Sequence, residues 1–447
     1  MKSVYKNILI PAFETFYKRR KTLQYLKRLE ETQWMSLGNL MKLQQESLES
    51  ILAHAYENIP YYNTLWNRNG LTDIKSLINN FERLPLLTKE IINTNQLSLQ
   101  APFSQEKLIA KSTGGSTGMP LHFYIDKGSY ERRNAISLRG YKWAGADLGT
   151  KQFYLWGGAL DNPGVKKVWK DRIYHLIHRR NILNSFTLNQ IPVEQSVKRF
   201  NHTQPDVLVA YTNALYHFAT DLERAGISPW SPKSIIVGAE KLHDFQRRKI
   251  ESIFNTDVYE TYGSREFMLI GSECHKHEGL HLSFEHLIVE ILNEDGSATK
   301  DGEVGNIVIT DLFNYGMPFI RYLTGDQAVA GIKMCTCGRE LPLLREVKGR
   351  QLDMLTFANG RKLPGEFFPH LFKDYSEISR FQVTQKTDHT IQISVVLAEN
   401  LPQNTERNIT SIIQNHVGDD VTVSWKEVNT IPLTLAGKHR VVVNQCA

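Results

Sequence analysis

The sequence has few cysteines, little net charge and no long apolar run, and each shortage excludes a class of protein. Its 447 residues include four cysteines, too few for a disulfide-stabilised scaffold and consistent with a reducing cytoplasm. The net charge is +6, with no dense basic block or basic–aromatic stripe, so we expect no nucleic-acid partner. Apolar residues make up 41% and charged residues 22%, which is typical of globular rather than disordered proteins.

The N-terminus is the one segment where membrane contact is an alternative. Residues 8–13 are apolar, but they are too few to span a bilayer and Pro11 interrupts them. No small-residue cleavage site follows, so we predict neither a signal peptide nor a transmembrane segment. The basic run Lys18–Lys21 comes next. The favoured interpretation is an amphipathic helix packed on the protein body, and the alternative is a peripheral contact with an anionic membrane face.

Helical periodicity dominates the first part of the chain. Between residues 22 and 95, Leu40, Leu48 and Leu52 recur at helical spacing. Thr88 is placed to cap a further helix. We therefore expect residues 1–95 to form a helical region packed on the rest of the protein.

The middle of the chain alternates between strand-like and helix-like segments. The strand-like runs are residues 207–211, 234–237 and 257–262, and the helical stretches are 213–225 and 244–254. This alternation predicts an α/β fold with mixed or parallel sheets flanked by helices. Further strands at 287–292 and 305–310, with a turn at 293–296, predict a β-rich subdomain.

The pattern changes again after residue 353. Strands are expected at 381–384, 391–397 and 421–428, with a helix at 405–416. This is typical of a small α+β domain. The predicted division is therefore a helical region (1–95), a large body (96–352) and a C-terminal domain (353–447).

The run from Lys111 to Pro120 concentrates glycine and hydroxyl side chains. Glycine lets backbone N–H groups approach a phosphate, and hydroxyls add further donors. No lysine follows Gly118, so this is not the motif of the P-loop NTPases. We predict a phosphate-binding loop rather than a plain surface turn. Its residues are Ser112, Thr113, Gly114, Gly115, Ser116, Thr117 and Gly118.

Six segments, in order, resemble the adenylate-forming ligases, the superfamily of acyl-CoA synthetases and luciferase. They are the loop 112–118, Gly238–Glu240, Thr261–Glu266, Tyr322–Asp326, Gly349–Asp353 and Thr434–Lys438. The branch they resemble is that of phenylacetate–CoA ligase. Residues 57–62 are similar to the same region in members attributed to capsular polysaccharide biosynthesis.

The resemblance implies that ATP activates a carboxylic acid as an acyl-adenylate, and it implies roles for single residues. Thr261 would donate to the α-phosphate, and Glu266 would hold Mg²⁺, a cation that prefers oxygen ligands. Tyr262 would lie against adenine, while Asp326 and Arg350 would contact the ribose. The other nucleotide-binding positions implied are Gly238, Ala239, Glu240, Gly263 and Ser264.

The C-terminal segment contains Lys438, which resembles the catalytic lysine of adenylation. A cation on a long stem can reach both the carboxylate and the α-phosphate as charge develops. Asp353 resembles the hinge about which a mobile C-terminal lid rotates between adenylation and acyl transfer. After Asp353 the chain departs from the family pattern, and Asn359–Gly360 predicts a hairpin turn. CoA is therefore one acceptor among several to consider.

Three of the four cysteines lie in two clusters that suggest a metal site. Cys335 and Cys337 form a tight Cys-x-Cys-Gly turn, and Cys274 lies upstream near several histidines. Three thiolates and one imidazole suit tetrahedral Zn²⁺, and some relatives of phenylacetate–CoA ligase carry a similar pattern. His281 is favoured over His277 as the fourth ligand. Four protein ligands leave no open position, so the expected role is structural; free thiols are the alternative.

The favoured function is that of a cytoplasmic ATP-dependent ligase that uses ATP, Mg²⁺ and a structural Zn²⁺. Its acceptor would be a thiol or an amine, the latter in a sugar-linked form, in surface polysaccharide biosynthesis. The alternatives are an aryl- or acyl-CoA ligase and a non-catalytic nucleotide-binding scaffold of a polysaccharide assembly complex. A zinc hydrolase is disfavoured because the metal site is closed. Trp156, Gly157, Tyr211 and Phe267 are candidates for the acyl pocket, although such residues also suit a plain core. The sequence does not identify the acid or the oligomeric state.

Overall fold

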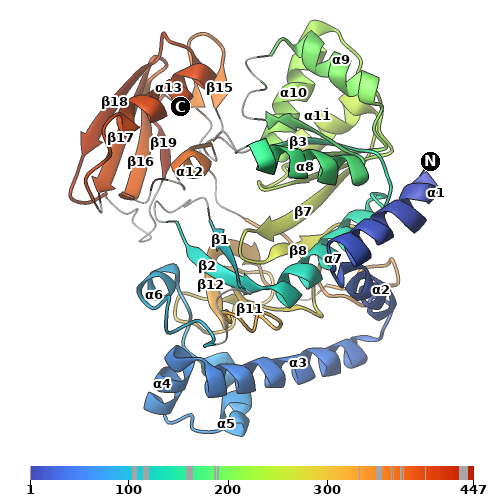
Figure 1. The fold of residues 1–447 in the computed structure, drawn as a ribbon, viewed down its shortest axis with the longest axis vertical. Helices are drawn as coiled ribbons and strands as arrows, with labels where there is room; N and C mark the ends of the chain where they lie inside the picture. The colour runs from blue at the N-terminus through green and yellow to red at the C-terminus, as the bar shows by residue number, and fades with distance from the viewer. Residues whose placement is uncertain are drawn as a thin grey trace.

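The computed structural model describes most of the chain and shows two lobes, drawn in Figure 1. The described residues are 2–102, 108–113, 120–157, 165–185, 188, 191–331, 333–348, 355–363, 365, 367–372, 375, 377–397, 399–431 and 441–446. Within them, no helix has the length and apolar character needed to cross a bilayer.

Helices make up the N-terminal region, as predicted. They are α1 (Lys2–Val4), η1 (Tyr5–Leu9), η2 (Ala12–Tyr17), α2 (Thr22–Thr32), α3 (Leu37–Asn58), α4 (Pro60–Arg68), α5 (Ile74–Asn79), η3 (Phe81–Arg83) and α6 (Lys89–Thr94). Leu40, Leu48 and Leu52 are buried on one side of α3. The hydroxyl of Thr88 accepts the N–H of Ile91 at 3.3 Å, which confirms the predicted helix cap.

An eight-stranded sheet forms the centre of the body. Its order is β13 (Leu343–Leu344), β9 (Leu280–Leu282), β8 (Met268–Ser272), β7 (Val258–Ser264), β6 (Ser234–Gly238), β5 (Val207–Tyr211), β3 (Gln152–Trp156) and β4 (Arg180–Asn184). Strands β3 to β7 run parallel to one another, and β8, β9 and β13 continue the sheet in antiparallel pairs. The predicted mixed α/β fold is confirmed.

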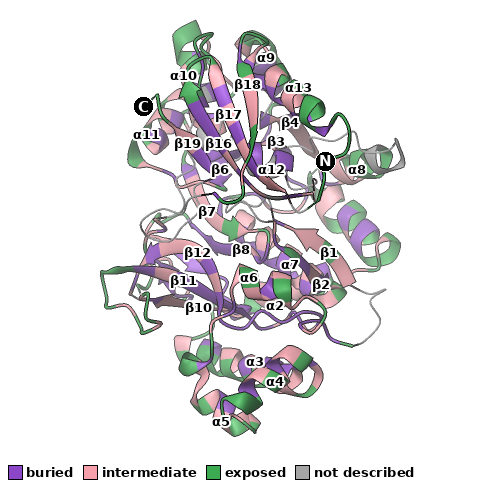
Figure 2. Ribbon diagram, turned by 90° about the vertical axis from the view of Figure 1, so that its left-hand side faces the viewer, coloured by how far each residue is buried: buried purple, intermediate pink, exposed green. Residues whose placement is uncertain are grey.

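Helices cover both faces of this sheet. They are α7 (Lys127–Trp143), α8 (Val165–Ile177), α9 (Val193–Thr203), α10 (Thr212–Ala225) and α11 (Asp244–Phe254). Every residue of β5 and β6 is buried; Figure 2 labels β6 and colours buried residues purple. Continuous apolar runs are required where a parallel strand is covered on both faces, which is why these strands were readable from the sequence.

Two smaller sheets lie beside the central one. Strands β10 (Leu287–Leu292), β11 (Val304–Asp311) and β12 (Tyr322–Val329) form an antiparallel sheet, as expected for the β-rich subdomain. Strands β1 (Leu108–Ser112) and β2 (His122–Asp126) pair as an antiparallel hairpin.

The C-terminal lobe is an α+β unit with its own apolar core. Its elements are β14 (Leu355–Thr356), β15 (Lys362–Leu363), α12 (Phe367–Phe372), β16 (Ile378–Thr387), β17 (Thr390–Leu397), α13 (Thr405–Val417), β18 (Thr422–Glu427) and β19 (Val442–Asn444). Strands β14 and β15 flank the predicted turn, where Gly360 has φ +78°. Tyr211, at the end of β5, packs against the core of this lobe.

Candidate functional site

The predicted phosphate-binding loop begins at the end of β1. The N–H of Thr113 donates to the carbonyl of Leu121 at 2.9 Å, and the Thr113 hydroxyl accepts the N–H of Leu121 at 2.9 Å. Ser112 is paired with His122 in the hairpin. These contacts hold together the two ends of the segment that contains Gly114–Gly118. That segment lies outside the described residues.

The Gly238–Glu240 segment follows β6 and meets the neighbouring strand closely. A Cβ atom on Gly238 would lie 2.5 Å from the hydroxyl oxygen of Thr261, so a larger residue would collide with β7. Ala239 has φ +70°, a conformation that non-glycine residues seldom adopt. The hydroxyl of Thr212 donates to the carbonyl of Glu240 at 3.1 Å. The segment is therefore a constrained turn at the carboxyl edge of the parallel strands, where ligands bind in open α/β sheets.

Thr261 is at this edge, but its hydroxyl is engaged. It donates to the carbonyl of Val237 at 2.8 Å. In this arrangement the hydroxyl hydrogen is not available to a phosphate, although the oxygen can still accept. The role of Thr261 as a phosphate donor stays a prediction that requires this bond to break.

Glu266 lies in the turn between β7 and β8 and is buried. Its Oε1 accepts the hydroxyl of Tyr322 at 3.0 Å. Its backbone carbonyl accepts from the guanidinium of Arg133. In the same turn, the hydroxyl of Ser264 accepts the N–H of Phe267 at 3.3 Å. The carboxylate is thus held in place by one oxygen, and its chemistry suits a hard cation such as Mg²⁺.

Tyr262 and Asp326 are joined directly. The Tyr262 hydroxyl donates to Oδ2 of Asp326 at 3.0 Å, and the Asp326 N–H donates to the Thr324 hydroxyl at 3.1 Å. The residues predicted to contact adenine and ribose, 64 positions apart in the chain, therefore meet in space. Arg350, Asp353 and Lys438 lie outside the described residues.

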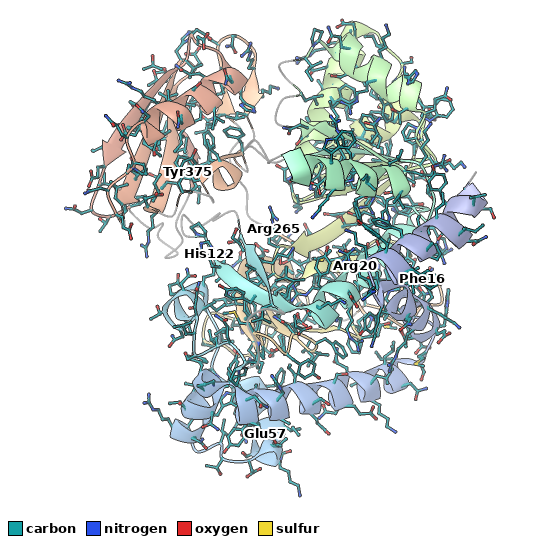
Figure 3. All side chains as sticks on the ribbon, in the orientation of Figure 1. Phe16, Arg20, Glu57, His122, Arg265 and Tyr375 are labelled. Carbon is teal, nitrogen blue, oxygen red and sulfur yellow. The ribbon has the colours of Figure 1, made fainter. Side chains whose placement is uncertain are left out.

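The sequence reasoning missed two cations beside this edge, Lys111 and Arg265. Burial and the nearby charges of Arg265 and Arg133 lower the pKa of Lys111, whose Nζ lies 5.2 Å from the ring centre of Tyr130. Figure 3 shows Arg265 in the body, on the side that faces the C-terminal lobe. Among the described residues, neither cation has a carboxylate within salt-bridge distance. The sequence signal that could have identified them is their position, because Lys111 directly precedes the 112–118 motif and Arg265 directly precedes Glu266.

The nearby Arg133 is neutralised, in contrast. Its Nη2 lies 2.5 Å from Oδ2 of Asp311, and both side chains are buried. Burial opposes ionisation of Asp311, but the charges of Arg133 and His286 hold its pKa below the usual value. Arg133 therefore supports the Glu266 turn as part of a paired structure.

The candidates for the acyl pocket separate in the structure. The rings of Trp156 and Tyr211 lie 4.3 Å apart at the carboxyl ends of β3 and β5. Phe267 instead packs in the body core, against Phe319 and Tyr322. Trp156 and Tyr211 therefore remain candidates for the pocket, while Phe267 is a core residue.

The four predicted metal ligands come together in one cluster. The ligand atoms of Cys274, His281, Cys335 and Cys337 all lie within 4.8 Å of one another. The Sγ atoms of Cys274 and Cys335 are 3.7 Å apart, and Sγ of Cys337 is 3.4 Å from Nε2 of His281. All four cysteines are free. Three sulfurs and one nitrogen at these separations fit a closed tetrahedral site for Zn²⁺.

The surroundings of the cluster also suit a metal. Nδ1 of His281 lies 3.2 Å from the carbonyl of Leu341, which leaves Nε2 facing the sulfurs. Burial lowers the pKa of His281 to about 4, so its imidazole is neutral at pH 7. Burial opposes ionisation of Cys337, but hydrogen bonds from the backbone and side chain of Arg339 hold its pKa below the usual value.

The other candidate histidine is directed elsewhere. Nδ1 of His277 lies 3.2 Å from a carboxylate oxygen of Glu273, and its ring packs against Tyr259. The structure therefore brings His281, and not His277, to the three sulfurs.

Comparisons with known proteins agree with this architecture. Residues 355–445 match the family described as the CapK C-terminal domain. The chain is 24% identical over 375 residues to the phenylacetate–coenzyme A ligase of Thermus thermophilus, covering 81% of each protein. It is 22% identical over 453 residues to Protein CapK of Staphylococcus aureus, covering 99% of this chain and 97% of CapK.

Solved structures show the same fold. A 2-hydroxyisobutyryl-CoA ligase in complex with 2-HIB-AMP and CoA, in the thioesterification state, matches with a TM-score of 0.61 and 18% identity. The match covers 92% of this chain and 91% of that one. The post-adenylation state of the same ligase matches with a TM-score of 0.58. The chain is therefore a homologue of the phenylacetate–coenzyme A ligases and of CapK, with the fold of the adenylate-forming ligases.

Proposed function

We propose that the protein activates a carboxylic acid with ATP and transfers the acyl group to a thiol such as that of coenzyme A. The observation that carries the proposal is the pairing of Tyr262 with Asp326 and of Glu266 with Tyr322 beside the base of the phosphate-binding loop. Relatives named phenylacetate–coenzyme A ligase, which this chain matches over about four-fifths of its length, support it.

The first step joins a carboxylate oxygen of the substrate to the α-phosphorus and breaks the bond to the β-phosphate, so pyrophosphate leaves. During this step the negatively charged carboxylate and phosphates must be held close together. Fixed cations and N–H donors stabilise these charges best where water is excluded. Lys111 and Arg265 place two positive charges beside the loop, and no carboxylate of the described chain lies within ion-pair distance of either. Lys438 is the proposed catalytic lysine, and Glu266 would hold Mg²⁺, which supplies further charge neutralisation when bound.

In the second step, the thiol sulfur attacks the acyl carbon, AMP leaves, and the thiol proton is released. The C-terminal lobe packs on Tyr211 and has Trp156 beside its core, so it reaches the strand ends where the acyl group would lie. We propose that residues 353–447 act as the lid that moves between the two steps.

Carboxylate-dependent exchange of labelled pyrophosphate into ATP tests the first step. We expect exchange with at least one acid in a panel that includes aryl, short-chain hydroxy and sugar acids. Lys438→Ala should reduce this exchange by about a hundredfold while ATP still binds. No exchange across the panel would contradict adenylation, and tight co-purifying partners without exchange would favour the scaffold instead.

A role in surface polysaccharide biosynthesis is a second, finer proposal. It is supported by the match to CapK along almost the whole chain and by the CapK C-terminal domain match at 355–445. If it is right, the adenylate trapped with ATP and a cell-derived acid mixture should contain a sugar acid or an acid that is attached to a sugar. Mass spectrometry of the trapped adenylate distinguishes this from an aryl acid.

We also propose that Cys274, His281, Cys335 and Cys337 bind a structural Zn²⁺. The four-ligand geometry supports this, because it leaves no position for a substrate or water. Metal analysis of the purified protein should find one zinc per chain. A content far below that value would contradict the proposal.

A further inference from the structure

Exposed apolar side chains gather on two helical segments of the described chain. One is the N-terminal helical segment, residues 2–17, and the other is α8. Sixteen large apolar side chains are exposed among the described residues, and these two segments hold eight of them. The eight are Val4, Ile8, Leu9, Phe16, Tyr17, Trp169, Ile173 and Leu176. Single exposed apolar residues need no explanation, but a concentration of them marks an interaction surface.

Each segment presents its apolar residues at helical spacing. In the N-terminal segment, Ile10 and Phe13 are buried, whereas Ile8 and Phe16 are 59% and 78% exposed. Figure 3 shows Phe16 near the outer margin of the molecule. The apolar face left outside is therefore a second face of this helix, additional to the one that packs on the body.

Helix α8 has the same arrangement. Trp169, Ile173 and Leu176 follow one another at intervals of four and three residues and are 59%, 49% and 71% exposed. Residues at these intervals lie on one side of a helix. The helix therefore presents a continuous apolar stripe to solvent.

The two segments touch through other side chains, so their exposed apolar residues flank one contact between them. The ring centres of Phe13 and Tyr174 are 6.2 Å apart. Nε2 of His178, just after α8, lies 3.2 Å from Oε1 of Glu14. Figure 1 shows the N-terminal segment running beside α8. We call residues 2–21 and 169–180 the basic–apolar surface.

Much of the positive charge of the chain lies in the sequence of this surface. Residues 2–21 contain six basic residues and one acidic residue, and residues 169–180 contain four basic residues and one acidic residue. The excess of eight positive charges is larger than the +6 of the whole chain, so the remainder is net negative, although Lys6 is paired with Asp147 and Arg20 with Glu14. Lys18, Arg19, Lys21, Lys170 and Arg172 form no ion pair with any described residue.

We propose that the basic–apolar surface docks the protein on an anionic membrane. Interfacial helices combine tryptophan, phenylalanine and leucine on one face with lysine and arginine around it, which is the composition seen here. The core of a protein interface is instead depleted of lysine, and a nucleic-acid site needs no exposed apolar stripe. The inference does not depend on the catalytic function, because the surface contains none of the proposed site residues.

Co-sedimentation of the full chain with vesicles tests the proposal. One set of vesicles is phosphatidylcholine, and the other contains equal parts of phosphatidylcholine and phosphatidylglycerol. We expect binding to the anionic vesicles, weaker binding at high salt because screening reduces the attraction, and little binding to phosphatidylcholine alone. A blue shift of the fluorescence that is lost in Trp169→Phe would show that this indole enters the lipid.

Two pairs of substitutions locate the contact. Ile8→Glu with Phe16→Glu, and separately Ile173→Glu with Leu176→Glu, should each lower vesicle binding by about tenfold. Leu97→Glu is the matched control, because Leu97 is 80% exposed but lies outside the surface. Circular dichroism and the thermal midpoint check folding, and pyrophosphate exchange without lipid should be unchanged.

Three results would overturn the proposal. One is the absence of binding to anionic vesicles by the unmodified protein. Another is binding that both pairs of substitutions leave intact. The third is self-association or retention of a protein partner that the substitutions abolish while lipid binding is absent, because the surface would then be a protein interface. A protein that docks but exchanges no pyrophosphate would leave this inference standing and would contradict the catalytic proposal alone.

Discussion

The Cys274, His281, Cys335 and Cys337 cluster and the proposed nucleotide edge, where Tyr262 meets Asp326, are built in opposite ways. Every donor of the cluster faces the other three, and its histidine is oriented by the carbonyl of Leu341. At the nucleotide edge, Tyr262–Asp326 and Glu266–Tyr322 are paired, but Lys111 and Arg265 lack carboxylate partners among the described residues. A site whose polar groups face one another suits stabilisation of the fold. A site whose cations have no carboxylate partner suits binding of an anion.

Removal of a cluster ligand should have the largest effect. Cys337→Ser should abolish stoichiometric zinc and lower the free energy of unfolding by several kcal/mol, because structural zinc contributes folding energy directly. Denaturant unfolding with metal analysis measures both. Cys446→Ser is the matched control, since Cys446 is exposed and lies outside the cluster. An unchanged free energy of unfolding in Cys337→Ser would contradict the view that the cluster stabilises the fold while the proposed nucleotide edge serves binding.

Removal of a cation at the nucleotide edge should affect activity and spare stability. Lys111→Met keeps much of the side-chain length and removes its charge. We expect pyrophosphate exchange to fall by about a hundredfold, the usual effect of deleting one electrostatic donor. The thermal midpoint should hold or rise, since Arg265 and Arg133 repel the lysine. Lys127→Met, on an exposed part of α7, serves as the control. A loss of stability that matches the loss of exchange would assign Lys111 a structural role.

Glu260 lies on β7, the strand that connects the two sites, and gives a pH prediction. Burial, together with the charge of Glu273, raises its pKa to about 7 against the hydrogen bond from Leu242 and the charges of Arg247 and Lys241. The folded state therefore holds the proton more tightly than the unfolded state does. Its contribution to stability is fully present below about pH 4.5 and is lost as the pH rises toward 7, at about 1.4 kcal/mol per unit of pKa difference.

Glu260→Gln should remove this part of the pH dependence. Thermal unfolding between pH 5 and pH 8, compared with the unmodified protein, measures the difference. The midpoints should diverge as the pH rises, with the variant the more stable. Parallel curves would show that Glu260 titrates normally.

The smallest effect is expected at the Tyr262–Asp326 pair. Tyr262→Phe keeps the ring and removes the hydroxyl that donates to Asp326 at 3.0 Å. One such bond contributes about 0.5–1.5 kcal/mol net, so exchange should fall by about two- to tenfold. If the loss lies in the KM for ATP, the hydroxyl positions the nucleotide. A loss in kcat alone would argue against that assignment.

The sequence predicted the fold well where burial leaves a strong pattern. The buried strands predicted at 207–211 and 234–237 and the alternating strands of the C-terminal lobe were found because apolar periodicity follows directly from which faces are covered. The sequence favoured His281 over His277 but could not decide between them, because the choice depends on how β9 pairs with β13. That pairing is a long-range contact and leaves no mark on local composition.

Single-residue roles were harder to predict than segments. Phe267 follows a motif residue but points into the core, and the hydroxyl of Thr261 is engaged by the next strand. Lys111 was overlooked because an isolated lysine is usually a solvated surface residue. Only the three-dimensional neighbourhood distinguishes it, since Arg265 and Arg133 are nearby and the described residues offer no acid within ion-pair distance.

The short strand β13 has a consequence for solubility. It consists of Leu343 and Leu344, and it covers the outer edge of β9. An uncovered sheet edge is a template for pairing with another chain. The segment that carries Cys335 and Cys337 leads directly into β13, so a bound metal would also fasten the strand that closes the sheet. On this view, chelation would expose the outer edge of β9, and edge-to-edge aggregation would begin before the rest of the fold is lost.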